Sequence, residues 1–334
     1  MTELPTQDLF ASVANEPPPA SAGKSTVSAP RYLLALSLFL LTLFATTTLG
    51  AGWYLSTRTD VTTDLLPFLT PGTVIAVWSD PDLLATGLMF SLPALFILLC
   101  HELGHYLACR RYGLPATLPY FIPAPLGLGT LGAFIKIKAQ IRSKRELLDV
   151  GAAGPIAGFL ALLPFLLYGV AKSQPAAVQL ASADQTSNLV LLLPGKCLGL
   201  ELAVRLFHGS LPQGTVMDLH PFALAAWVGL LATALNLLPL GQLDGGHILY
   251  AVSSKLQRKA VFFLWGALAL AGLFLWPGWI LWCVIVLIVG LRHPRVLDED
   301  EPLDPKRQLI AFVCLVLFVL SFMPIPVSLV PIIG

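Results

Sequence analysis

Three residues near the end of an apolar stretch have the types and spacing of a zinc-dependent hydrolase site. His101, Glu102 and His105 lie in CHELGHYLACRRYG, residues 100–113. Residues i and i+4 lie one above the other on a helix, so His101 and His105 can bind one metal ion between them. Glu102 lies beside them and can take a proton from water, which is the chemistry of the HExxH pattern. The sequence therefore predicts two metal ligands and a general base.

The alternative is that these are two ordinary interfacial histidines and a glutamate at a helix end. Charged and imidazole groups are costly within apolar sequence, and those found there are usually functional. Three such groups clustered in one apolar segment favour the catalytic interpretation.

A catalytic zinc ion usually takes a third protein ligand, and the nearby cysteines do not supply it. Cys109 shares the helix face of His101 and His105. However, Cys109 follows His101 by eight positions, which correspond to about 12 Å of helix and are too far for one ion to bridge all three side chains. Cys100 points away from that face.

We expect the third ligand to come from a second segment, NLLPLGQLDGGHILY at residues 236–250. Pro239 and the glycine pair that follows Asp244 should break the helix and turn the Asp244 carboxylate inward. His247 and Asp149 are alternatives, although an acid that opens a membrane span can instead serve the helix N-terminus. Asp244 could also be an ordinary acid of an interfacial loop.

The elements that position these residues must belong to a membrane protein. The chain of 334 residues is 56% hydrophobic and 12% charged, and its mean hydropathy is +0.79. Apolar runs long enough to cross a bilayer recur along it. The net charge of +1 gives no indication of a nucleic-acid partner, and the five scattered cysteines form neither a CxxC pair nor a disulfide framework.

We expect an all-α polytopic fold with about seven transmembrane helices. Residues 260–291 would be roughly 48 Å long as one helix, so WPG at 276–278 should divide them into a hairpin of two short helices. A polar loop is expected at 56–82, and an interfacial or re-entrant segment at 187–207. The expected spans are about 32–55, 83–108, 150–171, 219–240, the two halves of 260–291, and a last span from about 308.

The expected organisation has four parts. Residues 1–30 are predicted to be a disordered tail, because they are rich in proline, alanine and serine. Residues 31–82 supply the first transmembrane helix and an external loop. The catalytic core covers 83–255, and C-terminal transmembrane helices cover 256–334. We expect no cleaved signal peptide, because acidic residues precede a late first apolar run.

The distribution of lysine and arginine orients the expected spans. With the N-terminus in the cytoplasm, all but four of the 20 Lys and Arg residues fall in inside segments. We therefore expect an integral, multi-pass protein of a bacterial inner membrane, with the histidines of the second span near the cytoplasmic face. The four exceptions are Arg58, Lys172, Lys196 and Arg205.

Residues 115–141 are too rich in proline and glycine for a helix. Their tail, AFIKIKAQI at 133–141, alternates as a strand does. We expect a hairpin over 127–141 that dips toward the metal site, because non-helical backbone is tolerated at membrane depth where protein or water covers it. The alternative is a plain cytoplasmic loop whose lysines face lipid headgroups.

A strand with a free edge can pair with an extended peptide, so this hairpin is expected to bind substrate. The predicted substrate-binding residues in it are Gly132, Ala133 and Ile135. Only one of Ala133 and Ile135 is expected to aim its backbone N–H at the substrate. Asn236 is expected to donate its side-chain amide to the same unwound stretch.

Two motifs together resemble the site-2 protease family of intramembrane zinc metalloproteases. HELGH at 101–105 is similar to the HExxH of that family, and NLLPLGQLDGG at 236–246 is similar to its NxxPxxxLDG. AGPIAG at 153–158 resembles its Gly-Pro helix, and GTLGAFIKIK at 129–138 resembles its membrane re-entrant β-loop. The resemblance covers about residues 83–255 and is closest to the chloroplast and cyanobacterial branch.

The resemblance implies a core of three helices and one Zn²⁺ per chain, held by His101, His105 and Asp244. It also implies cleavage of single-span or membrane-anchored protein substrates. Many family members carry a PDZ domain, but residues 172–218 are about half the length of one, so substrate gating by a PDZ domain is not expected. Gly154 and Gly158 form a GxxxG pair, which lets helices pack closely.

We therefore expect an intramembrane zinc metalloendopeptidase that acts near the cytoplasmic side of the bilayer. One rival is a transporter or sensor that binds zinc without catalysis. Glu102 discriminates against this rival, because a transporter has no need of a base beside the metal. The other rival is an inactive family member that binds and escorts membrane proteins, and the intact motifs argue against it.

Overall fold

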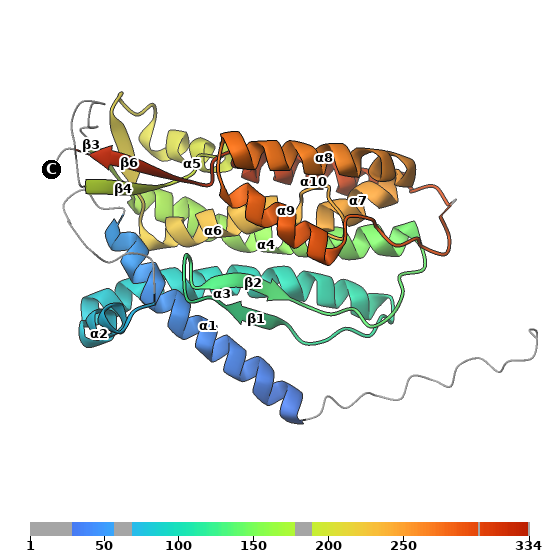
Figure 1. Ribbon diagram of the computed structural model, residues 1–334, viewed down its shortest axis with the longest axis horizontal. Coiled ribbons are helices and arrows are strands. Elements are labelled where there is room, and N and C mark those ends of the chain that lie inside the picture. The colour runs from blue at the N-terminus through green and yellow to red at the C-terminus, as the bar shows by residue number, and fades with distance from the viewer. Residues whose placement is uncertain (1–28, 57–68, 178–188, 300, 333–334) are drawn as a thin grey trace, which may run out of the picture.

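The computed structural model describes residues 29–56, 69–177, 189–299 and 301–332 (Figure 1). The described part is mostly helical, as predicted, and four of its helices are long and apolar enough to cross a bilayer. These four are α1 (Ala29–Ser56), α3 (Pro81–Arg111), α4 (Lys144–Lys172) and α8 (Ser254–Phe274). The predicted disordered tail lies almost entirely outside the described residues.

Helix α6 (Pro221–Asn236) packs with α3 and α4 to form the centre of the molecule (Figure 1). This helix is apolar almost throughout, and its residues from Ala223 to Leu230 are all buried. The indole N–H of Trp227 finds an acceptor at the Gly195 carbonyl, 3.0 Å away. Burial of α6 from all sides explains how a helix of 16 residues can hold the central position.

Helices α3 and α4 approach each other closely at one point. A Cβ atom on Gly104 of α3 would lie 2.4 Å from the carbonyl oxygen of Ala153 in α4. Real Cβ atoms are not found so close to a carbonyl oxygen, so the spacing of the two helices requires glycine there.

The predicted break at WPG is present. Helix α8 ends at Phe274, and α9 (Gly278–Val289) returns beside it. The last helix, α10 (Pro305–Ser321), begins slightly before the predicted span because Asp304 caps it by accepting from the N–H groups of Lys306 and Arg307. Helices α6, α9 and α10 are shorter than the four that could cross a bilayer alone.

Two segments differ from the expectation. The expected loop at 56–82 contains a helix, α2 (Pro71–Ser79), which a capping box between Thr70 and Thr73 stabilises. The expected interfacial segment at 187–207 is a strand, β4 (Leu189–Pro194), followed by α5 (Leu198–His208). Strand β4 pairs with β6 (Val327–Ile332), far along the chain. A short apolar run cannot be assigned to strand or helix by periodicity alone, so the local sequence does not predict this pairing.

A second unexpected sheet lies beside the first one. Strand β3 (Gln174–Ala177) pairs antiparallel with β5 (Thr215–Asp218), and α5 lies between them in the chain. Figure 1 shows these strands with β4, β6 and α5 at one end of the molecule. The predicted all-α fold with one β-hairpin is therefore corrected in part: the described residues form three two-stranded sheets, two more than predicted.

The predicted hairpin starts and ends earlier than expected. Strand β1 (Tyr120–Pro123) pairs antiparallel with β2 (Thr130–Phe134), with Phe121 opposite Ala133. The alternating tail beyond Phe134 makes only one isolated bridge, between Ile137 and Ala116. The connecting turn is fixed against α1, because Gly129 has a φ of +82° and a Cβ there would lie 2.6 Å from Thr46.

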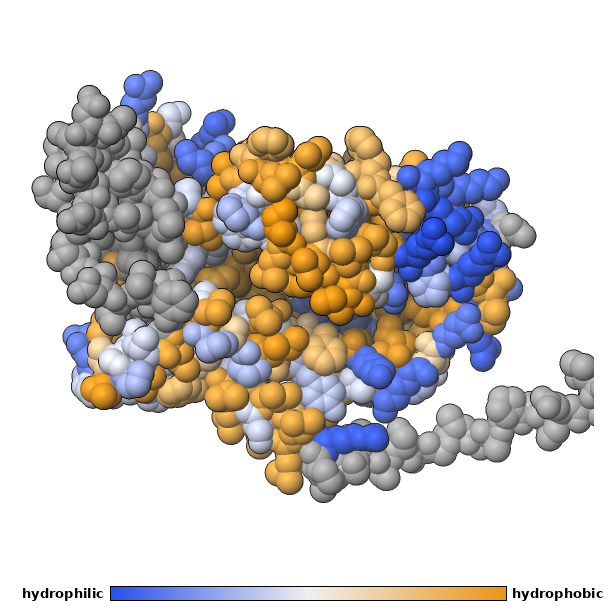
Figure 2. Space-filling view, viewed as in Figure 1, coloured by the Kyte–Doolittle hydropathy of each residue, from blue (hydrophilic) through white to orange (hydrophobic). Residues whose placement is uncertain are grey.

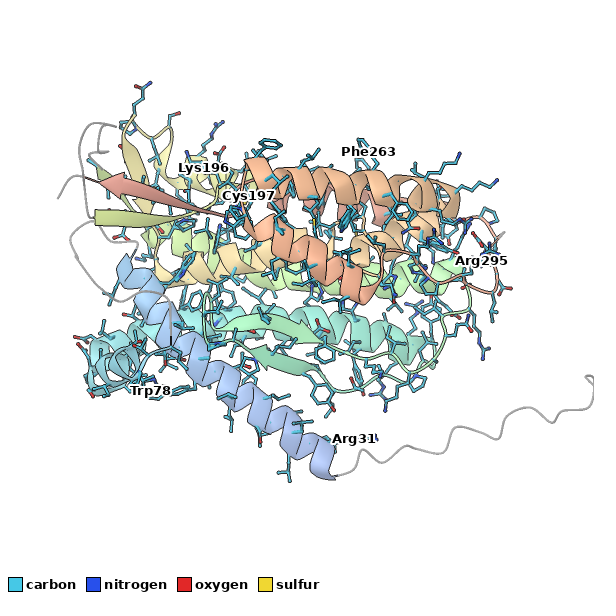
Figure 3. The ribbon with its side chains drawn as sticks, viewed as in Figure 1. Arg31, Trp78, Lys196, Cys197, Phe263 and Arg295 are labelled. Carbon is cyan, nitrogen blue, oxygen red and sulfur yellow. The ribbon has the colours of Figure 1, made fainter. Side chains whose placement is uncertain are left out.

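Hydrophilic side chains gather at one end of the molecule, whereas apolar ones cover its middle (Figure 2). Arg295 lies at the hydrophilic end, and Lys196 lies in the opposite half of the molecule (Figure 3). The segment between α9 and α10, which we call the strap (residues 290–304), is tied to this hydrophilic end by ion pairs. Arg145 pairs with Glu301 at 2.6 Å and Arg258 with Glu299 at 2.8 Å.

Candidate metal centre

The structure brings His101, His105 and Asp244 to one point. Their ligand atoms all lie within 4.8 Å of one another. Asp244 Oδ2 is 3.3 Å from the Nε2 atom of each histidine, and the two Nε2 atoms are 3.1 Å apart. Two imidazole nitrogens and one carboxylate oxygen form a donor set typical of catalytic zinc. The residues present therefore fit the metal that the sequence predicts.

A backbone carbonyl of α4 fixes the orientation of one ligand. His105 Nδ1 is 2.8 Å from the carbonyl oxygen of Val150. A carbonyl can only accept a hydrogen bond, so the proton of the neutral ring lies on Nδ1. The Nε2 lone pair of His105 is then directed at His101 and Asp244, as a metal ligand requires.

Glycines of α4 make the space that the two histidines occupy. A Cβ on Gly154 would lie 2.1 Å from His105 Nε2, and one on Gly158 would lie 3.1 Å from His101 Cβ. The GxxxG pair therefore accommodates imidazole rings, whereas the close backbone approach of α3 and α4 occurs at Gly104. Sequence analysis identified the small residues but not what fills the space beside them.

A tight turn places Asp244 opposite the histidines. Helix α7 (Asp244–Val252) folds back on the α6–α7 connection. A Cβ on Gly245 would lie 2.0 Å from the Leu237 carbonyl oxygen, and one on Gly246 would lie 2.4 Å from that of Gly241. The predicted role of this glycine pair thus has a physical basis, because any side chain would push the start of α7 away.

Glu102 is buried beside the ligands, with 6% of its surface exposed. The backbone N–H of Ile135, directly after β2, donates a hydrogen bond to its carboxylate. Asn236, at the end of α6, places Nδ2 3.3 Å from His101 Nε2. Ile135 and Asn236 were predicted to bind substrate, and both lie at the metal centre.

The other two predicted substrate-binding residues remain in the hairpin. The Gly132 N–H donates to Thr130 Oγ1 at 3.0 Å, within the turn. Ala133 packs in the cluster that contains Leu95, Leu98 and Phe121. Neither residue has a described contact with the metal ligands.

The two alternative third ligands have other partners. Asp149 accepts hydrogen bonds from the guanidinium of Arg307 at 2.7 and 2.9 Å and from the Tyr112 hydroxyl. His247 Nδ1 is 2.7 Å from Nε2 of His293. Asp149 and His247 therefore serve the packing of helix ends, and neither belongs to the group of converging ligand atoms.

His293, in the strap, is a residue of this region that no motif in the sequence indicates. Its Nδ1 lies 2.6 Å from the Pro294 carbonyl oxygen, which requires a proton on Nδ1, so Nε2 accepts from His247. Its ring stacks on Tyr250, with 4.2 Å between centroids. Burial is the main cause that lowers the pKa of His247 to about 4, and the neighbouring His293 imidazole contributes to the same shift. The pair is neutral and links α7 to the strap.

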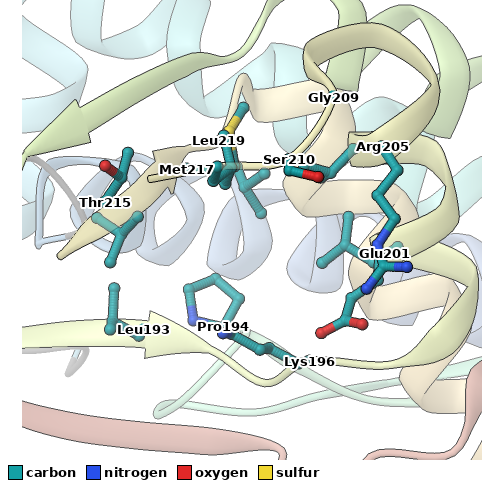
Figure 4. Close-up of a pocket in the computed structure, with 14 residues that line it drawn as sticks. Leu193, Pro194, Lys196, Glu201, Arg205, Gly209, Ser210, Thr215, Met217 and Leu219 are labelled. Carbon is teal, nitrogen blue, oxygen red and sulfur yellow. The ribbon is translucent and has the colours of Figure 1, made fainter. Parts of the chain in front are cut away.

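A separate cavity of about 320 Å³ lies among β4, α5 and β5 (Figure 4). Its charged lining residues are Lys196, Glu201 and Arg205. Figure 3 places Lys196 in the half of the molecule opposite Arg295. None of the predicted site residues lines this cavity, so it is not part of the metal centre.

Comparison with known proteins identifies relatives of the whole core. The sequence model of the family described as "Peptidase family M50" matches residues 89–273. A rice (Oryza sativa subsp. indica) protein named "Probable zinc metalloprotease EGY2, chloroplastic" is 30% identical over 260 residues, which are 76% of this chain and 45% of the relative. An Arabidopsis thaliana protein named "Probable zinc metalloprotease EGY1, chloroplastic" is 30% identical over 313 residues, 88% of this chain and 53% of the relative.

The chain thus spans about half the length of these relatives. No solved structure matches it.

The space beside His105 predicts a specific sensitivity. Gly154→Ala should displace the imidazole, because the added methyl group would overlap Nε2. We expect zinc affinity to fall by about 10–100-fold or more, as for other changes that disturb the support of a metal ligand. Chelator competition on the purified protein measures this.

Gly266→Ala in α8 is the matched control, because its Cβ would meet no atom within 4 Å. It should leave zinc affinity unchanged. Wild-type affinity in Gly154→Ala would contradict the assignment of Gly154 as the residue that clears space for His105.

Proposed function

This chain belongs to peptidase family M50, and from that premise we propose that it is an intramembrane zinc metalloendopeptidase. The observation that carries the proposal is the convergence of His101, His105 and Asp244 beside a buried Glu102. Buried charged groups in an apolar protein need a compensating partner, and one Zn²⁺ supplies it for this donor set. The names of the relatives as zinc metalloproteases support the same activity.

Different residues of the chain have different roles in the proposed peptide hydrolysis. A bound zinc ion supplies Lewis-acid polarisation of the scissile carbonyl and activation of water. His101, His105 and Asp244 hold it in a fixed position. Glu102 accepts a proton from the attacking water and passes it to the leaving amine, and the Ile135 N–H orients its carboxylate for this.

The substrate class follows from the position of the site. Two of the three metal ligands, His101 and His105, come from α3, a helix long and apolar enough to span a bilayer, so the scissile bond is presented within or near the membrane. A peptide bond in a membrane helix is already hydrogen-bonded, so hydrolysis requires local unwinding. The substrates are therefore single-span or membrane-anchored proteins that unwind at the site.

The unwound substrate would lie along β2. Residues two apart in a strand direct their N–H groups to the same edge. The Ile135 N–H is engaged by Glu102, so the Ala133 N–H is the one left to bind substrate at that edge. Asn236 would donate its amide to the same stretch from the opposite wall of the site.

The finer topology is part of the proposal. Helices α1, α3, α4, α6, α8, α9 and α10 would make seven spans, with β1 and β2 as a re-entrant hairpin. The lysine and arginine distribution supports placing the N-terminus and the strap in the cytoplasm. We propose that the membrane is the inner membrane of a bacterial cell. The gathering of hydrophilic side chains at the strap end supports placing that end outside the hydrocarbon layer.

Replacing the general base separates catalysis from metal binding. Glu102→Gln keeps the size of the side chain but cannot accept a proton as a carboxylate does. We expect kcat to fall by about 10²–10⁴-fold while zinc content stays at the wild-type level. A cleavage assay and metal analysis on the same detergent-purified sample measure both.

Retention of full cleavage in Glu102→Gln would reject the peptidase mechanism. Absence of cleavage in the wild type, with zinc bound, would favour a zinc transporter, a sensor or an inactive relative instead.

The choice of third ligand has its own test. Asp244→Asn removes the charge that faces both histidines, so zinc affinity should fall by at least 100-fold and cleavage should stop. Asp149→Asn is the matched control, because Asp149 is bonded to Arg307 and Tyr112 and should keep zinc. The reverse pattern, with zinc lost only in Asp149→Asn, would overturn the assignment of Asp244.

The strand hypothesis is tested by removing one backbone donor. Ala133→Pro deletes the N–H that would bind substrate and changes no charge. We expect cleavage of a single-span substrate to drop at least tenfold with zinc content unchanged. Ala133→Gly keeps the N–H and should cleave as the wild type does. Equal cleavage by both variants would show that substrate does not pair with β2 at this position.

A further inference from the structure

We propose that one anionic phospholipid binds in the groove between α7 and α10, with its phosphate at Lys144 and an acyl chain along α10. The groove has a volume of about 750 Å³. It lies beside the metal centre without including any of the metal ligands, and it reaches Gly245, the residue after Asp244. This site is additional to peptide hydrolysis and does not depend on it.

The walls of the groove are apolar faces of two helices. From α7 it is lined by Gly245, Ile248, Leu249 and Val252, which recur at helical spacing. The wall from α10 extends from Gln308 to Phe318, a distance of about 15 Å along the helix. That length equals about half the hydrocarbon thickness of a bilayer, which is the depth of one leaflet.

The groove opens toward the surface that lipid would cover. Val252, Phe312 and Leu315 line it and are 50%, 60% and 56% exposed. Exposed apolar side chains at the rim of a groove are unfavourable in water but not in contact with acyl chains. An acyl chain could therefore enter from the side without a change in the helices.

One end of the groove is polar, which gives it the shape of an amphiphile. Lys144, the first residue of α4, and Gln308 lie there with Pro302 and Leu303 of the strap. One N–H of the Gln308 amide donates to the Leu303 carbonyl at 3.0 Å, and Lys144 is the one charged residue among those that line the groove. Lys144 is thus the group at this end that can bind an anion.

The charge of Lys144 is not neutralised by the described residues. The adjacent Arg145 pairs with Glu301, and Arg307 pairs with Asp304. Among the described residues, Lys144 makes no ion pair and no side-chain hydrogen bond, although it is half-buried. A half-buried cation above an apolar groove complements a phosphate that carries an acyl chain.

Binding can be measured on the full-length protein in detergent by native mass spectrometry. The probes are phosphatidylglycerol and phosphatidylcholine with identical acyl chains, each titrated separately, with and without a zinc chelator. We expect one phosphatidylglycerol per chain, bound more tightly than phosphatidylcholine. Lys144→Gln should weaken phosphatidylglycerol binding about fivefold, the effect of about one charge at a lipid surface.

Further variants test whether binding is specific to Lys144 and to the groove. Lys255→Gln removes an exposed cation near the start of α8 that does not line the groove, and it should bind phosphatidylglycerol as the wild type does. Ala311→Phe fills the groove and should abolish retention of both lipids. Val252→Trp narrows the exposed rim and replaces Ala311→Phe if that variant does not fold.

Three outcomes would overturn the proposal. The first is equal affinity of the wild type for the two lipids. The second is an equal loss of phosphatidylglycerol binding in Lys144→Gln and Lys255→Gln. The third is one-for-one displacement of phosphatidylglycerol by a synthetic single-span peptide, which would assign the groove to a transmembrane helix. Because the measurement does not need cleavage or zinc, its failure leaves the proposed peptidase activity untouched.

Discussion

The close packing of α3 against α4 is the constraint on which the rest of the site depends. Gly104 allows the two helices to approach until the Ala153 carbonyl occupies the place of a side chain. Only at that separation can His105 donate to the Val150 carbonyl, and only the glycines of α4 leave room for the imidazoles. Helix spacing, ligand orientation and ligand tautomer are therefore set by one packing interaction.

That packing brings together buried polar groups whose desolvation the protein alone does not compensate. Two imidazole lone pairs and a carboxylate converge within 4.8 Å in buried or half-buried positions. Groups of this kind are costly inside an apolar protein unless they are paired or coordinate a cation. Metal binding is consequently coupled to the stability of the α3–α4–α7 arrangement, since the ligands come from separate elements that must all be in place.

The parts of the site that the sequence predicts are those encoded locally. His101 and His105 are recognisable because their spacing matches one helix turn, and Asp244 because proline and glycine break the helix around it. The Val150 carbonyl and His293 could not be predicted, because a backbone group has no residue signature and His293 meets His247 only through tertiary packing. The same reason explains β4 and β6, whose pairing joins segments more than 130 residues apart.

The β1–β2 hairpin and the buried carboxylate of Glu102 stabilise each other. Its turn is fixed on α1 through Gly129, and its far end gives the Ile135 N–H to Glu102. A buried carboxylate needs a hydrogen-bond donor, and an N–H beyond the end of a strand needs an acceptor. Each group therefore removes the free-energy cost of leaving the other unpaired. The end of β2 therefore lies beside Glu102. If substrate pairs with β2 as proposed, the segment that holds the peptide would also orient the proposed general base, which makes the position of β2 as important to the proposed chemistry as the HExxH helix itself.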